Sequence, residues 1–263
     1  MSGLFVRPPA DLSNPYSESA DTPPADDLQA KIAFEEEASR LFNRVICEFC
    51  LGGIVSQPTS PVHVSYARLI DGHVLITGGG GGREYYEDRS SGPALDLIQA
   101  RWLSWAHRPE TFVHDAMPLR RAARLADISE TLPEFVAGAY SLFSQRQINE
   151  ALIDAWVVCE QLVDYLWQQY RGSLPDSSRR KRLGDSRTYS VAVRLELLKT
   201  VGVLPDALYE ALNLARDHRN ELVHRATADL KRTTSTIQAM TLALAHVLGE
   251  GVAHADVSTG VNW

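Results

Sequence analysis

The stretch Gln147-Ile-Asn-Glu-Ala-Leu-Ile-Asp-Ala-Trp-Val-Val-Cys-Glu-Gln-Leu-Val-Asp-Tyr-Leu-Trp-Gln-Gln-Tyr170 decides the fold. Its apolar residues recur every three or four positions, which is the spacing of one side of an α-helix. They form one continuous stripe, made of Ile148, Leu152, Ala155, Trp156, Cys159, Leu162, Val163, Leu166 and Tyr170. The sequence therefore predicts one long amphipathic helix here, the strongest helix of the chain.

The sequence around this helix predicts an all-helical C-terminal half. A helix over residues 132–143 carries Pro133 in its first turn, where the missing N–H is harmless. A helix over 190–201 is closed by Gly202. Two further helices are expected over residues 205–226 and 228–248, and residues 171–187 are expected to form a polar loop. We therefore predict a helical domain over residues 130–250 and a C-terminal tail over 251–263.

The N-terminal half has a different pattern. Residues 1–30 are rich in Pro, Ser, Asp and Ala without apolar periodicity, which predicts a disordered tail. Helices are expected over 31–50 and 94–106, and residues 62–76 predict a β-hairpin turning at Asp71-Gly72. The predicted fold class is thus mainly α, with a helical bundle preceded by a smaller mixed α/β region over 31–128 whose role the sequence does not reveal.

Charge is distributed unevenly along the 263 residues. The net charge of −7 arises before Tyr140, because basic and acidic residues are equal in number after it. The densest basic run is Arg179-Arg180-Lys181-Arg182, in the C-terminal half. This distribution fits a protein that meets a polyanion at one place, and it does not fit a general nucleic-acid coat. These four residues could contact RNA phosphates, and a solvated loop is the alternative.

The sequence predicts no membrane segment, metal or cofactor. Its apolar runs are too short to span a bilayer and its N-terminus lacks a signal-peptide pattern, so we expect a cytoplasmic protein. The pair Cys47-x-x-Cys50 lacks two further zinc ligands, and His107 with His114 lacks a third partner. The glycine run Gly78–Gly82 is not followed by Gly-Lys-Ser/Thr, so it predicts a flexible exit from the hairpin.

The candidate site lies in Ala215-Arg-Asp-His-Arg-Asn-Glu-Leu-Val-His-Arg225, which groups Arg219, Asn220 and His224. A guanidinium fits phosphate oxygens, an imidazole can give or take a proton near neutral pH, and an amide can orient either group. On a straight helix Arg219 and His224 lie about 140° apart, whereas Asn220 and His224 share a side. A site therefore requires a bend or a pocket that wraps round the helix, and a merely polar helix face is the alternative.

This segment resembles the R-x4–6-H motif of the HEPN superfamily (higher eukaryotes and prokaryotes nucleotide-binding domains), which often has Asn directly after the Arg. The stretch Ala151–Glu160 resembles the first long HEPN helix with its trailing Glu. The turn Leu197–Gly202 and the apolar run Ala207–Leu214 precede the motif as in many such proteins. The resemblance covers roughly residues 130–250. It implies a helical bundle, dimerisation through the motif-bearing helices and, often, metal-independent endoribonuclease activity in toxins or antiviral defence.

The resemblance also implies roles for single residues. Arg219 would stabilise charge on the phosphoryl oxygens, His224 would act as general base or acid, and Asn220 would orient the His or the phosphate. Glu160 would support the site by pairing with Arg219 or Arg216, although a surface acid at the edge of the stripe is the alternative. Arg216 and His218 lie beside the motif and could extend the phosphate site, and an ordinary polar surface is the alternative for both.

Two other functions fit the same sequence. Some HEPN proteins are catalytically inactive, so the chain could bind RNA or nucleotide, or dimerise a larger defence complex. A third interpretation is a protein-interaction domain whose acidic N-terminal half masks the basic run. Expected partners are RNA, a second copy of the chain and an antitoxin or another defence protein, with no membrane.

Overall fold

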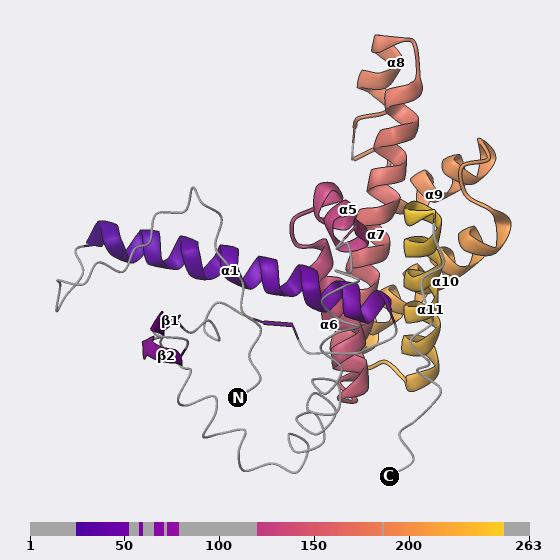
Figure 1. The fold of residues 1–263 in the computed structure, drawn as a ribbon. Coiled ribbons are helices and arrows are strands. Elements are labelled where there is room, and N and C mark those ends of the chain that lie inside the picture. Colours follow the sequence, from indigo (N-terminus) through magenta and orange to yellow (C-terminus); the bar gives the residue numbers. More distant parts are fainter. Residues whose placement is uncertain are drawn as a thin grey trace. The chain divides into compact units, whose positions relative to one another are not determined.

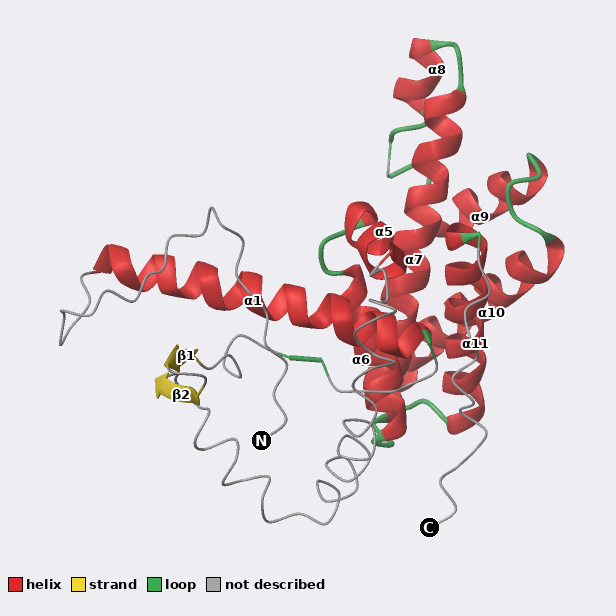
Figure 2. Cartoon of the chain, viewed as in Figure 1, coloured by secondary structure: helices red, strands yellow, loops and turns green. Residues whose placement is uncertain are grey.

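Helix α7 (Ile148–Ser173) is the element around which the helical part of the chain packs (Figure 1). The structure is a computed structural model, and it describes residues 25–52, 58–59, 66–70, 73–78, 120–185 and 187–249. Among the described helices, those that pack on α7 include α5 (Arg120–Ile128), α6 (Leu132–Ser144), α9 (Val191–Thr200), α10 (Asp206–Arg225) and α11 (Leu230–Leu248). The described part of the chain is mainly helical, as predicted (Figure 2).

The apolar stripe of α7 is buried as its periodicity predicts. Leu152, Ala155, Cys159 and Leu162 are fully buried, and the ring of Trp156 is nearly so. Helices α6 and α11 also meet directly, where the Tyr140 hydroxyl lies 2.8 Å from Oγ1 of Thr241. The core therefore lies between α7 and the helices that surround it.

The chain divides into two units, and the helical one begins earlier than expected. This helical unit comprises Arg44–Pro58 and Arg120–Trp263. It includes α5 and the last turns of α1 (Ala25–Leu51), whereas the sequence places the start of the helical domain near residue 130. The reason is a buried carboxylate: Glu48 of α1 accepts hydrogen bonds from Arg121 Nε at 2.6 Å and from the Ala122 N–H at 3.0 Å. These contacts join α5 to α1 across 73 residues of sequence.

The other unit comprises Met1–Asn43 and Thr59–Leu119. Within it, α1 starts at Ala25, so residues 25–30 are helical although the sequence predicts a tail there. Strands β1 (Tyr66–Ile70) and β2 (His73–Gly78) pair antiparallel on either side of residues 71–72, where the hairpin is expected. The predicted helix over 94–106 lies outside the described residues, as does most of the glycine run.

Among the described helices, none combines the length and the apolar character needed to cross a bilayer. The three cysteines are buried and reduced. Burial raises the pKa of the Cys159 thiol to about 12 and holds that of Cys47 well above its usual value. These thiols therefore stay protonated at neutral pH and belong to the core.

Asp154 is a half-buried carboxyl group where α6 and α7 pack. A Cβ placed on Gly138 of α6 would come within 2.4 Å of its Oδ2 atom, so only glycine leaves room for the carboxyl there. Burial, and secondarily the charge of Glu134, raises the pKa of Asp154 to about 6 from an ordinary value of 3.8. The folded state therefore favours the protonated carboxyl. Its stabilising contribution is full below about pH 4 and is lost as pH rises through about 6.

We predict that Asp154→Asn raises the melting temperature at pH 7.5, because it removes a carboxylate that the fold disfavours. The gain over wild type should shrink as the pH falls to about 4.5, where Asp154 is itself protonated. Thermal melts across this pH range measure it. Asp127→Asn, on the exposed side of α5, is the control for removal of a carboxylate. A gain from Asp154→Asn that does not depend on pH would contradict the assignment.

Candidate functional site

Helix α10 carries the whole candidate motif without interruption. The helix is continuous from Asp206 to Arg225, and Ala226 ends it in a left-handed conformation with φ of 57°. The Ala226 N–H donates to the carbonyl of Leu222 at 2.7 Å. The whole motif therefore lies within one uninterrupted helix. The two side chains leave one copy of α10 about 140° apart.

Arg219 occupies a core position of α10. The buried residues of this helix are Leu208, Leu212, Ala215 and Leu222. Arg219 follows Ala215 by four positions and precedes Leu222 by three, so it continues the same stripe. Its side chain is half-buried, and Nη1 donates to the amide oxygen of Asn220 at 3.2 Å. The core position of Arg219 could have been predicted from spacing alone, because Arg219 occupies a position of the stripe where an apolar residue is expected.

Arg219 also differs from its neighbours in charge pairing. Arg216 pairs with Asp217 at 3.0 Å, and Glu221 pairs with Arg225 at 2.5 Å and with Arg232 at 3.0 Å. No described carboxylate lies within ion-pair distance of Arg219. A guanidinium has five N–H donors, so Arg219 has donors left for an anion.

His224 lies in the last turn of α10 and is exposed. Asn220 is one turn earlier, on the same side of the helix. Val223, one turn after Arg219, is 59% exposed. The surface of α10 around Arg219 and His224 therefore combines cationic, amide, imidazole and apolar groups.

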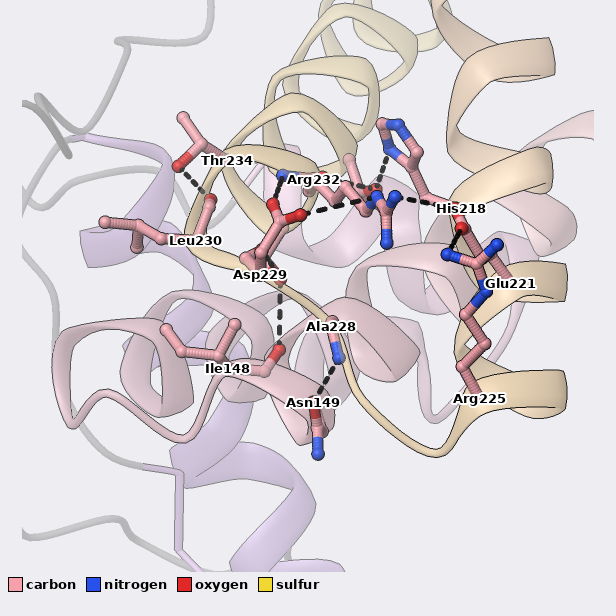
Figure 3. A network of polar contacts seen from close by, with 12 residues as sticks. Ile148, Asn149, His218, Glu221, Arg225, Ala228, Asp229, Leu230, Arg232 and Thr234 are labelled. Carbon is pink, nitrogen blue, oxygen red and sulfur yellow. Dashed lines mark hydrogen bonds and ion pairs between the residues drawn. The ribbon is translucent and has the colours of Figure 1, made fainter.

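A network of polar contacts fixes the end of the motif (Figure 3). Glu221 joins α10 to Arg232 of α11, and Asp229 caps α11 by accepting from the Arg232 N–H at 2.8 Å. The Ala228 N–H donates to the side-chain oxygen of Asn149 at 2.8 Å, in the first turn of α7. The turn that follows the motif is thus held against the N-terminal end of α7.

His218 belongs to the packing of α10 on α11. Its Nδ1 atom lies 3.4 Å from Oγ1 of Thr236 (Figure 3). Burial, and secondarily the charge of Arg232, lowers the pKa of His218 below its usual 6.5. The imidazole is therefore neutral at neutral pH. The His218 side chain contacts the neighbouring helix α11. It therefore lies on a different side of α10 from His224.

Glu160 has a different partner from the one expected. Its carboxylate accepts a hydrogen bond at 3.1 Å from the indole Nε1 of Trp156, one turn earlier on α7. Arg216, the other supporting residue, pairs with the adjacent Asp217. The expectation that Glu160 pairs with Arg219 or Arg216 is therefore wrong, because a donor on its own helix is closer at hand.

The basic run does not lie beside the motif. Residues 177–182 form a short helix, α8 (Ser177–Arg182), where the sequence predicts a loop. Leu183, directly after α8, accepts a hydrogen bond from Trp167 near the C-terminal end of α7. The motif turn is held at the opposite end of α7, by Asn149.

Within the described residues, no group of three or more His, Cys, Asp or Glu side chains could hold a metal ion. His107 and His114 lie outside the described residues. One cavity of about 150 Å³ is lined by α5, Tyr165 of α7 and the end of α11, and one of about 180 Å³ lies over α6 and Asp154. Neither is lined by the motif.

Comparison with protein-family models, with curated proteins and with solved structures finds no match.

We predict that Arg219→Leu leaves the fold intact and raises the melting temperature by a few degrees. Leucine completes the apolar stripe of α10 and removes a half-buried charge, a gain on the order of 1 kcal/mol. Calorimetry or thermal circular dichroism measures it. Leu212→Ala in the same stripe is the opposite control and should cost about 2–5 kcal/mol. A lower melting temperature for Arg219→Leu would mean that the guanidinium itself holds the fold together.

Proposed function

We propose that the chain is a metal-independent endoribonuclease of HEPN type, acting as a homodimer in a toxin or phage-defence setting. One observation supports this above the others. The half-buried guanidinium of Arg219 touches Asn220 and has no described carboxylate partner, and an exposed imidazole follows one turn further on. These are the groups that cleavage of RNA without a metal requires.

The helical unit is consistent with the proposal. A long helix with an apolar stripe packs against the helix that carries the motif, and a further helix follows. This is the order of elements that the HEPN resemblance implies. The setting in defence rests on the resemblance alone.

The catalytic centre would be composite, because one copy of α10 holds Arg219 and His224 on different sides. Two copies of α10 packed about a two-fold axis would place His224 of each opposite Arg219 of the other. Val223 and Leu230 would be covered by this contact; they are 59% and 60% exposed in the single chain. Exposed apolar groups beside polar ones are typical of protein interfaces.

The reaction would proceed by attack of the ribose 2′-oxygen on the adjacent phosphorus. His224 of one copy takes the 2′-OH proton, and the leaving 5′-oxygen takes a proton from water. The bond from the 2′-oxygen to phosphorus forms while the bond from phosphorus to the 5′-oxygen breaks. Arg219 stabilises the charge on the phosphoryl oxygens, and Asn220 holds the guanidinium. The products are a 2′,3′-cyclic phosphate and a 5′-hydroxyl, and DNA, which lacks the nucleophile, is not cut.

We predict that the purified chain cleaves RNA in EDTA and leaves 2′,3′-cyclic phosphate ends. His224→Ala should reduce the rate about 10²–10⁴-fold, as expected for a general acid or base. His246→Ala is the matched control, because His246 is an exposed histidine in the last turn of α11. Equal rates for both variants would show that His224 takes no part in the reaction. Cleavage that stops in EDTA would show that the reaction needs a metal.

A mixing experiment tests the composite site. Arg219→Ala and His224→Ala are each inactive if the proposal holds. When the two are unfolded together and refolded, half of the dimers are mixed and each mixed dimer has one intact site, so roughly a quarter of wild-type activity should return. Refolded wild type sets the scale. No recovery from mixed dimers shown to form by mass spectrometry would place both residues of a site on one chain.

One observation favours an inactive binding module as the second candidate. The separation of Arg219 and His224 on a continuous helix leaves a single copy with an anion site and no adjacent base. A module of this kind would shift the mobility of RNA without cutting it. A pure interaction protein would neither shift the mobility of RNA nor cut it. One RNA, assayed for mobility shift and for cleavage, therefore distinguishes the three functions.

A further inference from the structure

Helix α8 holds the basic run in a fixed arrangement. Asp176 caps the helix by accepting from the Ser178 N–H at 2.8 Å and from the Arg179 N–H at 3.3 Å. Arg180 donates to the carbonyl of Leu174 at 2.6 Å. These bonds order a segment that its length and charge would otherwise leave unfolded.

The C-terminal side of α8 is anchored to α7. The indole N–H of Trp167 donates to the carbonyl of Leu183 at 3.2 Å. The Trp167 ring also lies 5.6 Å from the ring of Tyr189 and 5.7 Å from that of Tyr170. Both tyrosines are half-buried beside α8. Basic side chains next to accessible aromatic rings are a common feature of single-stranded RNA sites.

Three cations of α8 have no described counter-charge. Arg179, Lys181 and Arg182 are exposed, and no described carboxylate lies within ion-pair distance of them. The two acidic residues nearest in sequence already accept hydrogen bonds from adjacent residues. Asp176 caps α8, and Asp185 accepts from Thr188 Oγ1 at 2.6 Å and from the Arg187 N–H at 3.1 Å. Like charges this close repel, so a polyanion bound here would relieve the repulsion.

The length of α7 between the turn after the motif and the end of α8 sets the minimum length of a ligand that reaches both. Asn149 holds the motif turn and Trp167 holds the end of α8, and the two residues are 18 positions apart on α7. At about 1.5 Å per residue this is roughly 27 Å along the helix axis. A nucleic-acid strand covers that length in about eight nucleotides at roughly 3.4 Å each.

We propose that Arg179, Lys181 and Arg182 of α8 form a second phosphate-binding site for the same RNA, near the opposite end of α7 from the turn that follows the motif. This rests on the proposed RNA substrate. The site binds the backbone, so it selects substrates by length and not by sequence. RNA is favoured over an acidic peptide because α8 carries aromatic rings beside its cations and a second cation without a described carboxylate partner, Arg219, lies in the same helical unit. A strand long enough to reach both would gain from each.

The test measures RNA binding by fluorescence anisotropy in the full chain carrying His224→Ala, which prevents cutting. The probes are labelled single-stranded RNAs of about 20 and about 4 nucleotides, longer and shorter than the span from motif to α8. The triple variant Arg179→Gln, Lys181→Gln, Arg182→Gln keeps Arg180, whose guanidinium holds α8 to Leu174. We expect at least tenfold weaker binding of the long RNA, and a slope of log affinity against log salt that is lower by about 2. Binding of the short RNA should not change.

A charge-retaining variant, Arg179→Lys with Arg182→Lys, is the matched control and should bind the long RNA as the His224→Ala chain does. Unchanged binding of the long RNA by the triple variant, or an equal loss for both lengths, would overturn the proposal. So would a wild-type chain that binds polyglutamate or anionic vesicles through α8 but no RNA. Cleavage in EDTA is scored separately. If the chain cuts RNA but the triple variant binds it unchanged, only the α8 proposal is wrong. If binding depends on α8 but RNA is not cut, only the nuclease proposal is wrong.

Discussion

The burial of one side of α7 is the constraint on which the helical unit depends. Each large apolar side chain of its stripe contributes roughly 1.5–3 kcal/mol when it leaves water, and α5, α6, α9, α10 and α11 all contact this helix. Because α7 is a continuous helix of 26 residues, it also acts as a rigid spacer. Asn149 in its first turn holds the turn after the motif, and Trp167 near its other end holds α8. The turn after the motif and the basic run of α8 are therefore kept apart by the element that forms the core.

The same packing gives Arg219 its importance. Half-burying a cation in an apolar stripe costs free energy unless a partner compensates it, and no described carboxylate lies within ion-pair distance of Arg219. A leucine would suit this position of α10 better for stability alone. Positions where a sequence departs from what packing favours are often functional. Arg219 is thus a stronger candidate than Arg216 or Arg225, whose charges are balanced by neighbouring acids.

The helices predicted most closely are those in which periodic apolar residues extend over many turns. The helices at 148–173, 206–225 and 230–248 differ from their predicted bounds by only a few residues, because their apolar stripes face the core. The sequence missed α8, which has four cations in six residues and is held by tertiary bonds to Leu174 and Trp167 that no local pattern shows. It missed α5 because this helix is short and depends on a buried carboxylate 73 residues earlier. For the site, the roles of Arg219, Asn220 and His224 stay a prediction. The expected partner of Glu160 was wrong, because long-range pairing cannot be read from one helix.

Two routes could bring Arg219 and His224 to one phosphate, and their costs differ. Bending the last turn of α10 would break the pairing of Glu221 with Arg232 and the hydrogen bond from Ala228 to Asn149. It would also give up backbone hydrogen bonds of a continuous helix. Packing a second copy against α10 breaks none of these contacts, and it covers Val223, which is 59% exposed in the single chain. For the proposed nuclease, the contacts at the motif end therefore favour a site completed by assembly over a site closed within one chain. Under that proposal, activity would depend on the concentration of the chain.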